Sequence, residues 1–194
     1  MKLSAKEFNA MQSPWRRWYV RAVELPTFRK FGLRIRDRDI LEVGCGSGYA
    51  ASLITSEAPR SYTGLDIMPE QLSLARSRAL RNARFVEGSA DDLSAFSDGS
   101  FDAVLDFCIL HHVEGWRGFF DECRRVLRPG GSIYIADLSK RCVHLVDAAF
   151  RWGHAEAALF TFGELEREAN RRGFVTDRKA IDLGLEGYFR FRRR

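Results

Sequence analysis

Ile40-Leu41-Glu42-Val43-Gly44-Cys45-Gly46-Ser47-Gly48, which leads into Tyr49 to Ile54, is the stretch that decides the fold. Its branched apolar residues predict a buried parallel strand, and three glycines follow that strand at once. Glycine suits a sharp turn with positive φ, and its lack of a side chain lets a ligand lie against the backbone. Helical spacing of apolar residues resumes at Tyr49, so the loop leads to a helix N-terminus with unpaired N–H groups. The pattern indicates a nucleotide-type pocket.

Two acidic residues strengthen this interpretation, since glycine turns also join strands to helices for purely structural reasons. Glu42 lies inside the apolar strand, where a buried carboxylate needs a cationic ligand or a network of donors. Asp66 ends the next apolar run, where a carboxylate can accept hydrogen bonds from both hydroxyls of a ribose bound over the glycine loop.

Together with Leu127-Arg128-Pro129-Gly130-Gly131, these residues resemble the class I S-adenosylmethionine-dependent methyltransferases, and among them the type 11 branch that includes quinone-biosynthesis enzymes. The resemblance covers roughly residues 40–137. It implies an α/β fold, with a Rossmann-like, doubly wound, seven-stranded sheet that is mostly parallel and ends in an antiparallel C-terminal hairpin. It also implies S-adenosylmethionine as cofactor, S-adenosylhomocysteine as product, and in-line methyl transfer to an O, N or C nucleophile of a small molecule.

The resemblance further implies roles for single residues. Glu42 and the glycine loop would hold the methionine end of the cofactor, Asp66 the ribose, and Phe107 the region beside the sulfonium. The family usually has an acid at the position of Ser89, so the adenine is assigned to Ala90 and Asp91 instead. The expected cofactor residues are Glu42, Gly44, Cys45, Gly46, Gly48, Asp66, Ile67, Met68, Ala90, Asp91 and Phe107.

The segment before the first strand predicts an amphipathic helix that Ser13 caps and Pro26 ends. We expect its aromatic stripe to pack mainly on the sheet. In the resembling family the N-terminal segment also closes over the cofactor, so an aromatic residue here could shield the cofactor and an arginine could meet its carboxylate. The candidates are Trp15, Tyr19, Arg16 and Arg17.

His111 and His112 follow the expected strand at 101–107, at the end that should face the transferable methyl group. Either could be a general base, because imidazole titrates near cytoplasmic pH; the alternative is that a histidine here only orients its loop. The sequence lacks the Asn-Pro-Pro-aromatic and Pro-Cys motifs of nucleic-acid base methylases, which counts against that activity. No metal site is visible, and the four cysteines form no Cys-x-x-Cys pair.

The length of 194 residues predicts one methyltransferase domain over residues 1–194. Within it we expect an N-terminal helical cover at 1–39, a cofactor-binding core at 40–137, a substrate-cover segment at 138–160, and a C-terminal helix with a strand pair at 161–194. No apolar stretch is long enough to cross a bilayer and no signal peptide is visible, so a cytoplasmic location is expected.

The net charge of +5 leaves other functions open. An RNA methyltransferase, or a non-catalytic partner that binds S-adenosylmethionine or RNA, is the alternative to a small-molecule enzyme. A nicotinamide dehydrogenase is disfavoured, because its third glycine would fall at Tyr49 and its pyrophosphate would meet Glu42. The oligomeric state cannot be inferred from the sequence.

Overall fold

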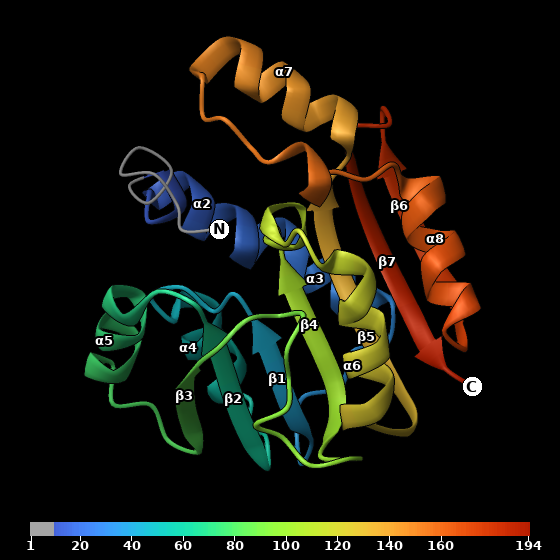
Figure 1. The fold of residues 1–194 in the computed structure, drawn as a ribbon. Helices are drawn as coiled ribbons and strands as arrows, with labels where there is room; N and C mark the ends of the chain where they lie inside the picture. The colour runs from blue at the N-terminus through green and yellow to red at the C-terminus, as the bar shows by residue number, and fades with distance from the viewer. Residues whose placement is uncertain (1–9) are drawn as a thin grey trace.

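A seven-stranded sheet forms the centre of the computed structural model, which describes residues 10–194 (Figure 1). Its order is β3-β2-β1-β4-β5-β7-β6. Strands β1 to β5 are parallel, and β7 pairs antiparallel with both β5 and β6. The predicted doubly wound, Rossmann-like sheet with an antiparallel C-terminal hairpin is confirmed. The strands are β1 (Asp39–Val43), β2 (Ser61–Asp66), β3 (Ala83–Glu87), β4 (Phe101–Phe107), β5 (Leu127–Leu138), β6 (Phe174–Asp182) and β7 (Glu186–Arg193).

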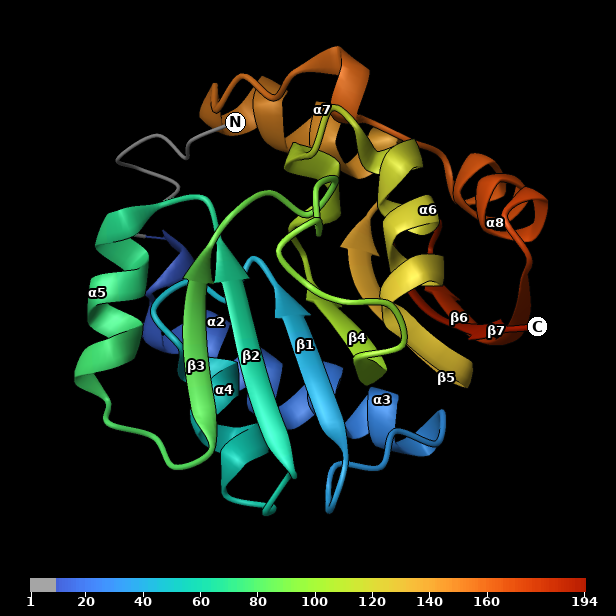
Figure 2. The ribbon, with the colours of Figure 1, turned by 60° about the horizontal axis from the view of Figure 1, so that its bottom comes forward.

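Helices cover both faces of the sheet (Figure 2). On one face lie α2 (Pro14–Tyr19), the π-helix η1 (Val20–Glu24), α3 (Leu25–Lys30) and α4 (Tyr49–Thr55). On the other lie α6 (Trp116–Val126) and α8 (Phe162–Arg171), while α5 (Pro69–Ser77) packs beside β3. The carboxyl ends of β4 and β5 lead to η2 (Leu110–His112), α7 (Lys140–Phe150) and η3 (Glu156–Ala158). None of the helices in residues 10–194 is long and apolar enough to cross a membrane.

Two hydrophobic clusters form the core, one on each face of the sheet. Neighbouring residues of β1 belong to different clusters, Ile40 to one and Leu41 to the other, because successive side chains of a strand point to opposite faces. Leu41 packs in the cluster that contains Phe119 and Phe120 of α6, and Ile40 in the one that contains Phe28 of α3. Burial on both faces fixes the register of the parallel strands, and so fixes where their carboxyl ends lie.

The N-terminal helical segment departs from the sequence-based expectation. The prediction that Pro26 ends it was wrong: the chain continues through η1 and α3 to Lys30. Pro26 lies in the first turn of α3, where a missing N–H is tolerated, and the wider π turn precedes it. Trp15 and Trp18 do not pack on the sheet; they stack on each other with ring centroids 4.8 Å apart and are 67% and 50% exposed.

The C-terminal third follows the local signals in the sequence. Thr161 and Glu164 form the capping box at the start of α8, and the closing strand pair is present as β6 and β7. Strand β5 begins at Leu127, the first residue of the Leu127-Arg128-Pro129-Gly130-Gly131 motif, and its pairing with β4 shifts register near Phe101. The division of the chain into four segments stays a prediction.

Candidate functional site

Two adjoining cavities open at the carboxyl ends of β1, β2 and β4. The larger has a volume of about 220 Å³ and the smaller about 70 Å³. Both are lined by Met11, Gly44, Gly46 and Gln71, so the glycine loop lies at their shared boundary. Strands β1 and β4 are neighbours here although β2 and β3 come between them in the chain. The cavities therefore lie at the topological switch point, where doubly wound sheets bind ligands.

The glycine loop has the conformation that the sequence predicted. Gly44, Gly46 and Gly48 have φ of +66°, +51° and +74°. A Cβ on Gly44 would lie 2.5 Å from the Ile109 side chain, so only glycine fits there. Gly44, Cys45 and Gly46 line the cavities, whereas Gly48 does not and lies against Ala75. The first part of the loop therefore forms the floor of the site, and Gly48 packs α4 against α5.

Asp66 is fixed at the end of β2 by backbone donors. One carboxylate oxygen accepts from the Gly46 N–H at 2.8 Å, and the other accepts from the Met68 N–H at 2.9 Å. Burial raises the pKa of Asp66, while the N–H groups of Met68, Gly46 and Ile67 act in the opposite direction. The carboxylate lines the larger cavity. It is held rigidly and keeps lone pairs available for further donors.

Glu42 is buried at 2% exposure and lines the smaller cavity. Its carboxylate accepts a 2.6 Å hydrogen bond from the Tyr62 hydroxyl. Burial raises the pKa of Glu42 to about 8, although the Tyr62 bond lowers it. A carboxyl group in this state favours a cationic ligand, because a positive charge would offset the cost of its ionisation.

Arg16 brings a positive charge to the same cavity. It forms an ion pair with Glu24 at 2.5 Å and donates to the Phe107 carbonyl at 2.9 Å. Burial raises the pKa of Glu24 to about 7, against the effect of Arg16. Arg16, Arg17 and Phe107 all line the smaller cavity. The N-terminal segment thus reaches the site through its arginines.

Of the two N-terminal aromatic candidates, neither lines either of these two cavities. The Tyr19 hydroxyl bonds the Glu186 carboxylate and lies 2.9 Å from the Tyr188 hydroxyl, and Trp15 is exposed to solvent.

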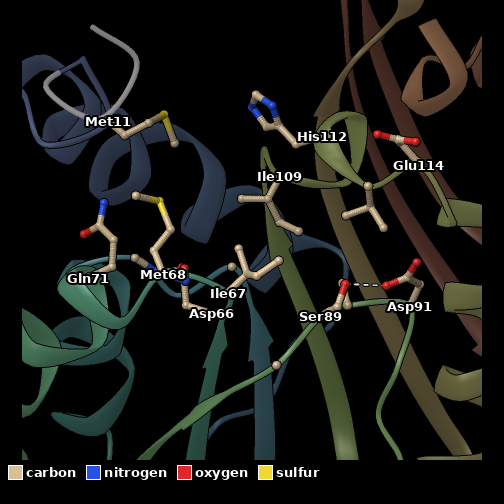
Figure 3. Close-up of a pocket in the computed structure, with 15 residues that line it drawn as sticks. Met11, Asp66, Ile67, Met68, Gln71, Ser89, Asp91, Ile109, His112 and Glu114 are labelled. Atoms are coloured by element: carbon tan, nitrogen blue, oxygen red, sulfur yellow. Dashed lines mark hydrogen bonds between the residues drawn. The ribbon is translucent and has the colours of Figure 1, made fainter. Parts of the chain in front are cut away.

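The larger cavity has mostly apolar walls with a few polar groups (Figure 3). The Ser89 hydroxyl donates to the Asp91 carboxylate, so the serine that replaces the family's acid positions a carboxylate two residues later. Across the cavity, the amide oxygen of Gln71 is buried without a hydrogen-bond partner in the described residues. An unsatisfied buried acceptor fits a ligand that donates to it. The apolar wall comprises Met11, Ile67, Met68, Ala90, Ile109 and Val113.

His111 and His112 differ in their surroundings although they are neighbours in η2. The His111 ring bonds the Asp137 carboxylate through Nδ1, and its backbone N–H donates to the same carboxylate at 3.2 Å. Asp137 comes from β5 and is fully buried. His112 lines the larger cavity, and burial together with the nearby His111 and His154 lowers its pKa to about 2. The two rings lie 4.1 Å apart between centroids.

Several residues of the site escaped the sequence analysis. Asp137 was expected only as the last residue of the cofactor-binding core, yet its position near the end of β5 could have suggested a partner for a histidine after β4. Gln71 lies one turn into α5, and no apolar pattern marks it. Met11 and Ile109 are apolar residues whose pocket-facing position depends on the tertiary structure. Each of these residues contributes to a cavity wall or to a histidine contact.

Comparison with known proteins adds a family to this geometry. Residues 41–135 match the model of a family described as "Methyltransferase domain". The chain is 40% identical over 146 residues to a probable phthiotriol/phenolphthiotriol dimycocerosates methyltransferase 2 of Mycobacterium ulcerans, an alignment that covers 74% of this chain and 53% of that protein. It is 39% identical over 109 residues to a fatty-acid O-methyltransferase of Mycolicibacterium smegmatis, covering 55% and 39% of the two chains. The chain thus spans about half or less of these relatives.

Solved structures share the fold. A SAM-dependent methyltransferase from Aquifex aeolicus aligns with a TM-score of 0.78 over 98% of this chain and 99% of that chain, at 15% sequence identity. At this identity the likeness concerns the architecture alone.

Proposed function

We propose, from the premise that this chain belongs to the class I S-adenosylmethionine-dependent methyltransferases, that it transfers a methyl group to a hydroxyl oxygen of a lipid-like small molecule. The observation that supports a hydroxyl acceptor is the buried His111–Asp137 pair. Neither residue lines a cavity itself, but the His111 ring lies 4.1 Å from the ring of His112, which lines the larger one. Relatives named as methyltransferases of lipids and of fatty acids support the acceptor class.

We assign the two cavities to S-adenosylmethionine. In this proposal Glu42 receives the cofactor's ammonium group, and Arg16 or Arg17 its carboxylate, because these charges line the smaller cavity. Asp66 accepts from the ribose hydroxyls, and Gln71 accepts from a donor that reaches into the space between the cavities. Gly44 cannot carry a side chain, because a Cβ there would clash with Ile109. The cofactor can therefore lie directly against the backbone of the glycine loop.

The adenine belongs in the larger cavity. Ile67 and Met68 offer an apolar surface on one side, and Asp91 offers an acceptor for an amino group. Ser89 orients that acceptor through its hydroxyl. The remaining expected residues, Cys45 and Ala90, line the site with small surfaces.

When bound, S-adenosylmethionine supplies an activated methyl group on a sulfonium with a neutral leaving group, so the protein needs no strong electrophilic catalyst. The tasks of this chain are to hold the donor and acceptor in line, to exclude water and to accept a proton. Phe107 and the Arg16 contact to its carbonyl fix the wall beside the methionine end.

His111 is the proposed base. Asp137 fixes its Nδ1, which leaves Nε2 to accept the proton of an acceptor hydroxyl. His112 lacks such a carboxylate and lines the cofactor cavity instead, so we assign it to shaping the site. Burial and the nearby Asp137 raise the pKa of Asp106 well above its ordinary value, so this region disfavours a further negative charge and favours a neutral hydroxyl over a carboxylate acceptor.

Exposed apolar side chains support a lipid-like acceptor. Trp15 and Trp18 on α2, and Leu145 and Phe150 on α7, are at least half exposed. Both helices lie beyond the carboxyl ends of the parallel strands (Figure 1), which is also the end of the sheet where the cavity-lining residues lie. Apolar residues grouped beside a site commonly mark a binding surface.

A methyl-transfer assay tests this function. The protein is incubated with S-adenosylmethionine labelled in its methyl group and, separately, with long-chain alcohols, the matching fatty acids, and transfer RNA. Label in an ether of the alcohols is expected. Label in RNA, or in none of these acceptors while S-adenosylhomocysteine still binds, would overturn the acceptor assignment.

A further inference from the structure

Three of the four histidines in the chain converge on one point next to the proposed methyl-transfer site. His111 and His112 come from η2, and His154 comes from the segment between α7 and η3. The ring centroid of His154 lies 5.3 Å from that of His111 and 4.8 Å from that of His112. One ligand nitrogen of each ring lies within 4.8 Å of the others. Such a gathering of imidazoles is the donor set of many metal sites.

Two of the rings carry a carboxylate on Nδ1. Asp137 bonds Nδ1 of His111, and Asp147 lies 2.7 Å from Nδ1 of His154. Asp147 is itself fixed, because it accepts from the backbone N–H groups of Gly153 and His154 at 3.1 Å each. A carboxylate on one ring nitrogen orients the ring and directs metal ligation to the other nitrogen, an arrangement typical of metal-bound histidines.

The third ring, that of His112, has a buried nitrogen, Nδ1, without a hydrogen-bond partner in the described residues. Leaving a buried polar atom unpaired is unfavourable, so a ligand that supplies the missing interaction would be stabilising. The other side of His111 offers a poorer set: Cys108, His111 and Asp137 also lie within 4.8 Å, but Asp137 is already committed to orienting the His111 ring.

We propose that His111, His112 and His154 bind a divalent transition-metal ion of the zinc class. Nitrogens bound to one tetrahedral zinc ion at 2.0–2.1 Å lie about 3.3 Å apart. The ligand atoms of this set lie within 4.8 Å of one another and would draw closer on binding the ion. Three histidines leave a fourth position open for water or another ligand. Neutral imidazoles select Zn²⁺, Co²⁺ or Ni²⁺ over Mg²⁺ and Ca²⁺, which require oxygen ligands.

The ion would join two parts of the molecule. Two ligands belong to the turn after β4, and the third belongs to the segment that follows α7. Ligation and proton acceptance would use the same nitrogen of His111, so the ion would compete with the role of His111 as a base. The ion would also restrain the segment that carries His154. The binding measurement below uses no cofactor and no acceptor, and its outcome is therefore separate from that of the proposed function.

The test is a titration of the metal-free chain of 194 residues with Co²⁺, prepared without a polyhistidine tag and treated with a chelator beforehand. Tetrahedral nitrogen ligation is expected to give a visible d–d absorption band that saturates at one Co²⁺ per chain and disappears on addition of Zn²⁺. Mg²⁺ should not displace Co²⁺.

Variants assign the site. His154→Ala should abolish the band, and Asp147→Asn, which keeps all three rings, should weaken Co²⁺ binding about 10- to 100-fold. His144→Ala is the matched control, because His144 is exposed and contacts Glu156 outside the cluster. Circular dichroism establishes that each variant is folded. A wild-type protein without the band, or a band that persists in folded His154→Ala, would overturn the proposal.

Discussion

The two halves of the site are built in different ways. We define the cofactor side as the glycine loop and the ends of β1 to β3. Backbone contacts within a short stretch of sequence hold this side, such as the hydrogen bonds from the Gly46 and Met68 N–H groups to Asp66. The acceptor side, which comprises η2, the end of β5 and residues 138–160, joins side chains that are distant in sequence, such as His111 and Asp137. A local motif forms the first, and the tertiary fold assembles the second.

This difference predicts that substitutions on the acceptor side lower kcat without weakening cofactor binding, and that substitutions on the cofactor side weaken cofactor binding. The largest effect should follow His111→Ala. Loss of the proposed base should lower kcat about 10²- to 10⁴-fold, measured as methyl transfer in the presence of a chelator, while the Kd for S-adenosylhomocysteine stays within about twofold. Asp98→Ala, at an exposed position outside both sides of the site, serves as the control and should leave kcat unchanged. A reduced affinity with unchanged kcat in His111→Ala would assign this residue to the cofactor instead.

The converse effect is expected for Asp66→Ala. Removing the acceptor of the ribose hydroxyls should weaken S-adenosylhomocysteine binding roughly 100-fold, since hydrogen bonds to charged groups contribute about 1.5–3 kcal/mol each. Calorimetric titration measures the loss. Asp98→Ala is the control, because the Asp98 side chain is 81% exposed and forms a surface ion pair with Arg125. Wild-type affinity in Asp66→Ala would remove the ribose assignment.

The pH dependence of cofactor binding tests Glu42. In the free protein its pKa is about 8, so the carboxyl group is largely protonated at pH 6–7. A bound ammonium group favours the carboxylate, so binding releases a proton below pH 8. Affinity for S-adenosylhomocysteine should therefore rise with pH by up to tenfold per unit between pH 6 and 8, then level off. Glu42→Gln should bind more weakly and lose this slope; an equal slope in the variant would contradict the role of Glu42.

The smallest effect concerns stability. Because burial raises the folded-state pKa of Glu42 above the ordinary value of 4.5, the stability of the free protein falls as pH rises from about 4.5 to 8. Glu42→Gln should raise Tm by a few degrees at pH 8, at about 2–4 °C per kcal/mol, and by less at pH 5. Glu70→Gln, at an exposed position, should change neither value. A lower Tm for Glu42→Gln at pH 8 would mean that the buried carboxylate is stabilising.

Much of the fold and of the cofactor side was predictable because short-range patterns specify them. The strand from Ile40, the glycine loop and Asp66 lie within one stretch, and three positive φ angles confirm the turn. The acceptor side was only partly predictable. His111 and His112 were recognised, but their partners lie on β5 and beyond α7, and no spacing rule connects them.

Propensity rules also failed where tertiary packing prevailed. Pro26 was expected to end a helix, but the π-helix before it lets the helical path continue to Lys30. The aromatic stripe of α2 was expected to pack inward, but Trp15 and Trp18 are exposed to solvent. Both departures concern the cover of the site rather than its floor.

The measurement that tests the central claim most directly is calorimetric titration of the purified protein with S-adenosylmethionine, S-adenosylhomocysteine and NADH in parallel. The two sulfur ligands should each bind at one site per chain, and NADH should give no response, because Glu42 beside the glycine loop disfavours a pyrophosphate. Binding of NADH, or no binding of either sulfur ligand, would contradict the assignment of the two cavities to S-adenosylmethionine.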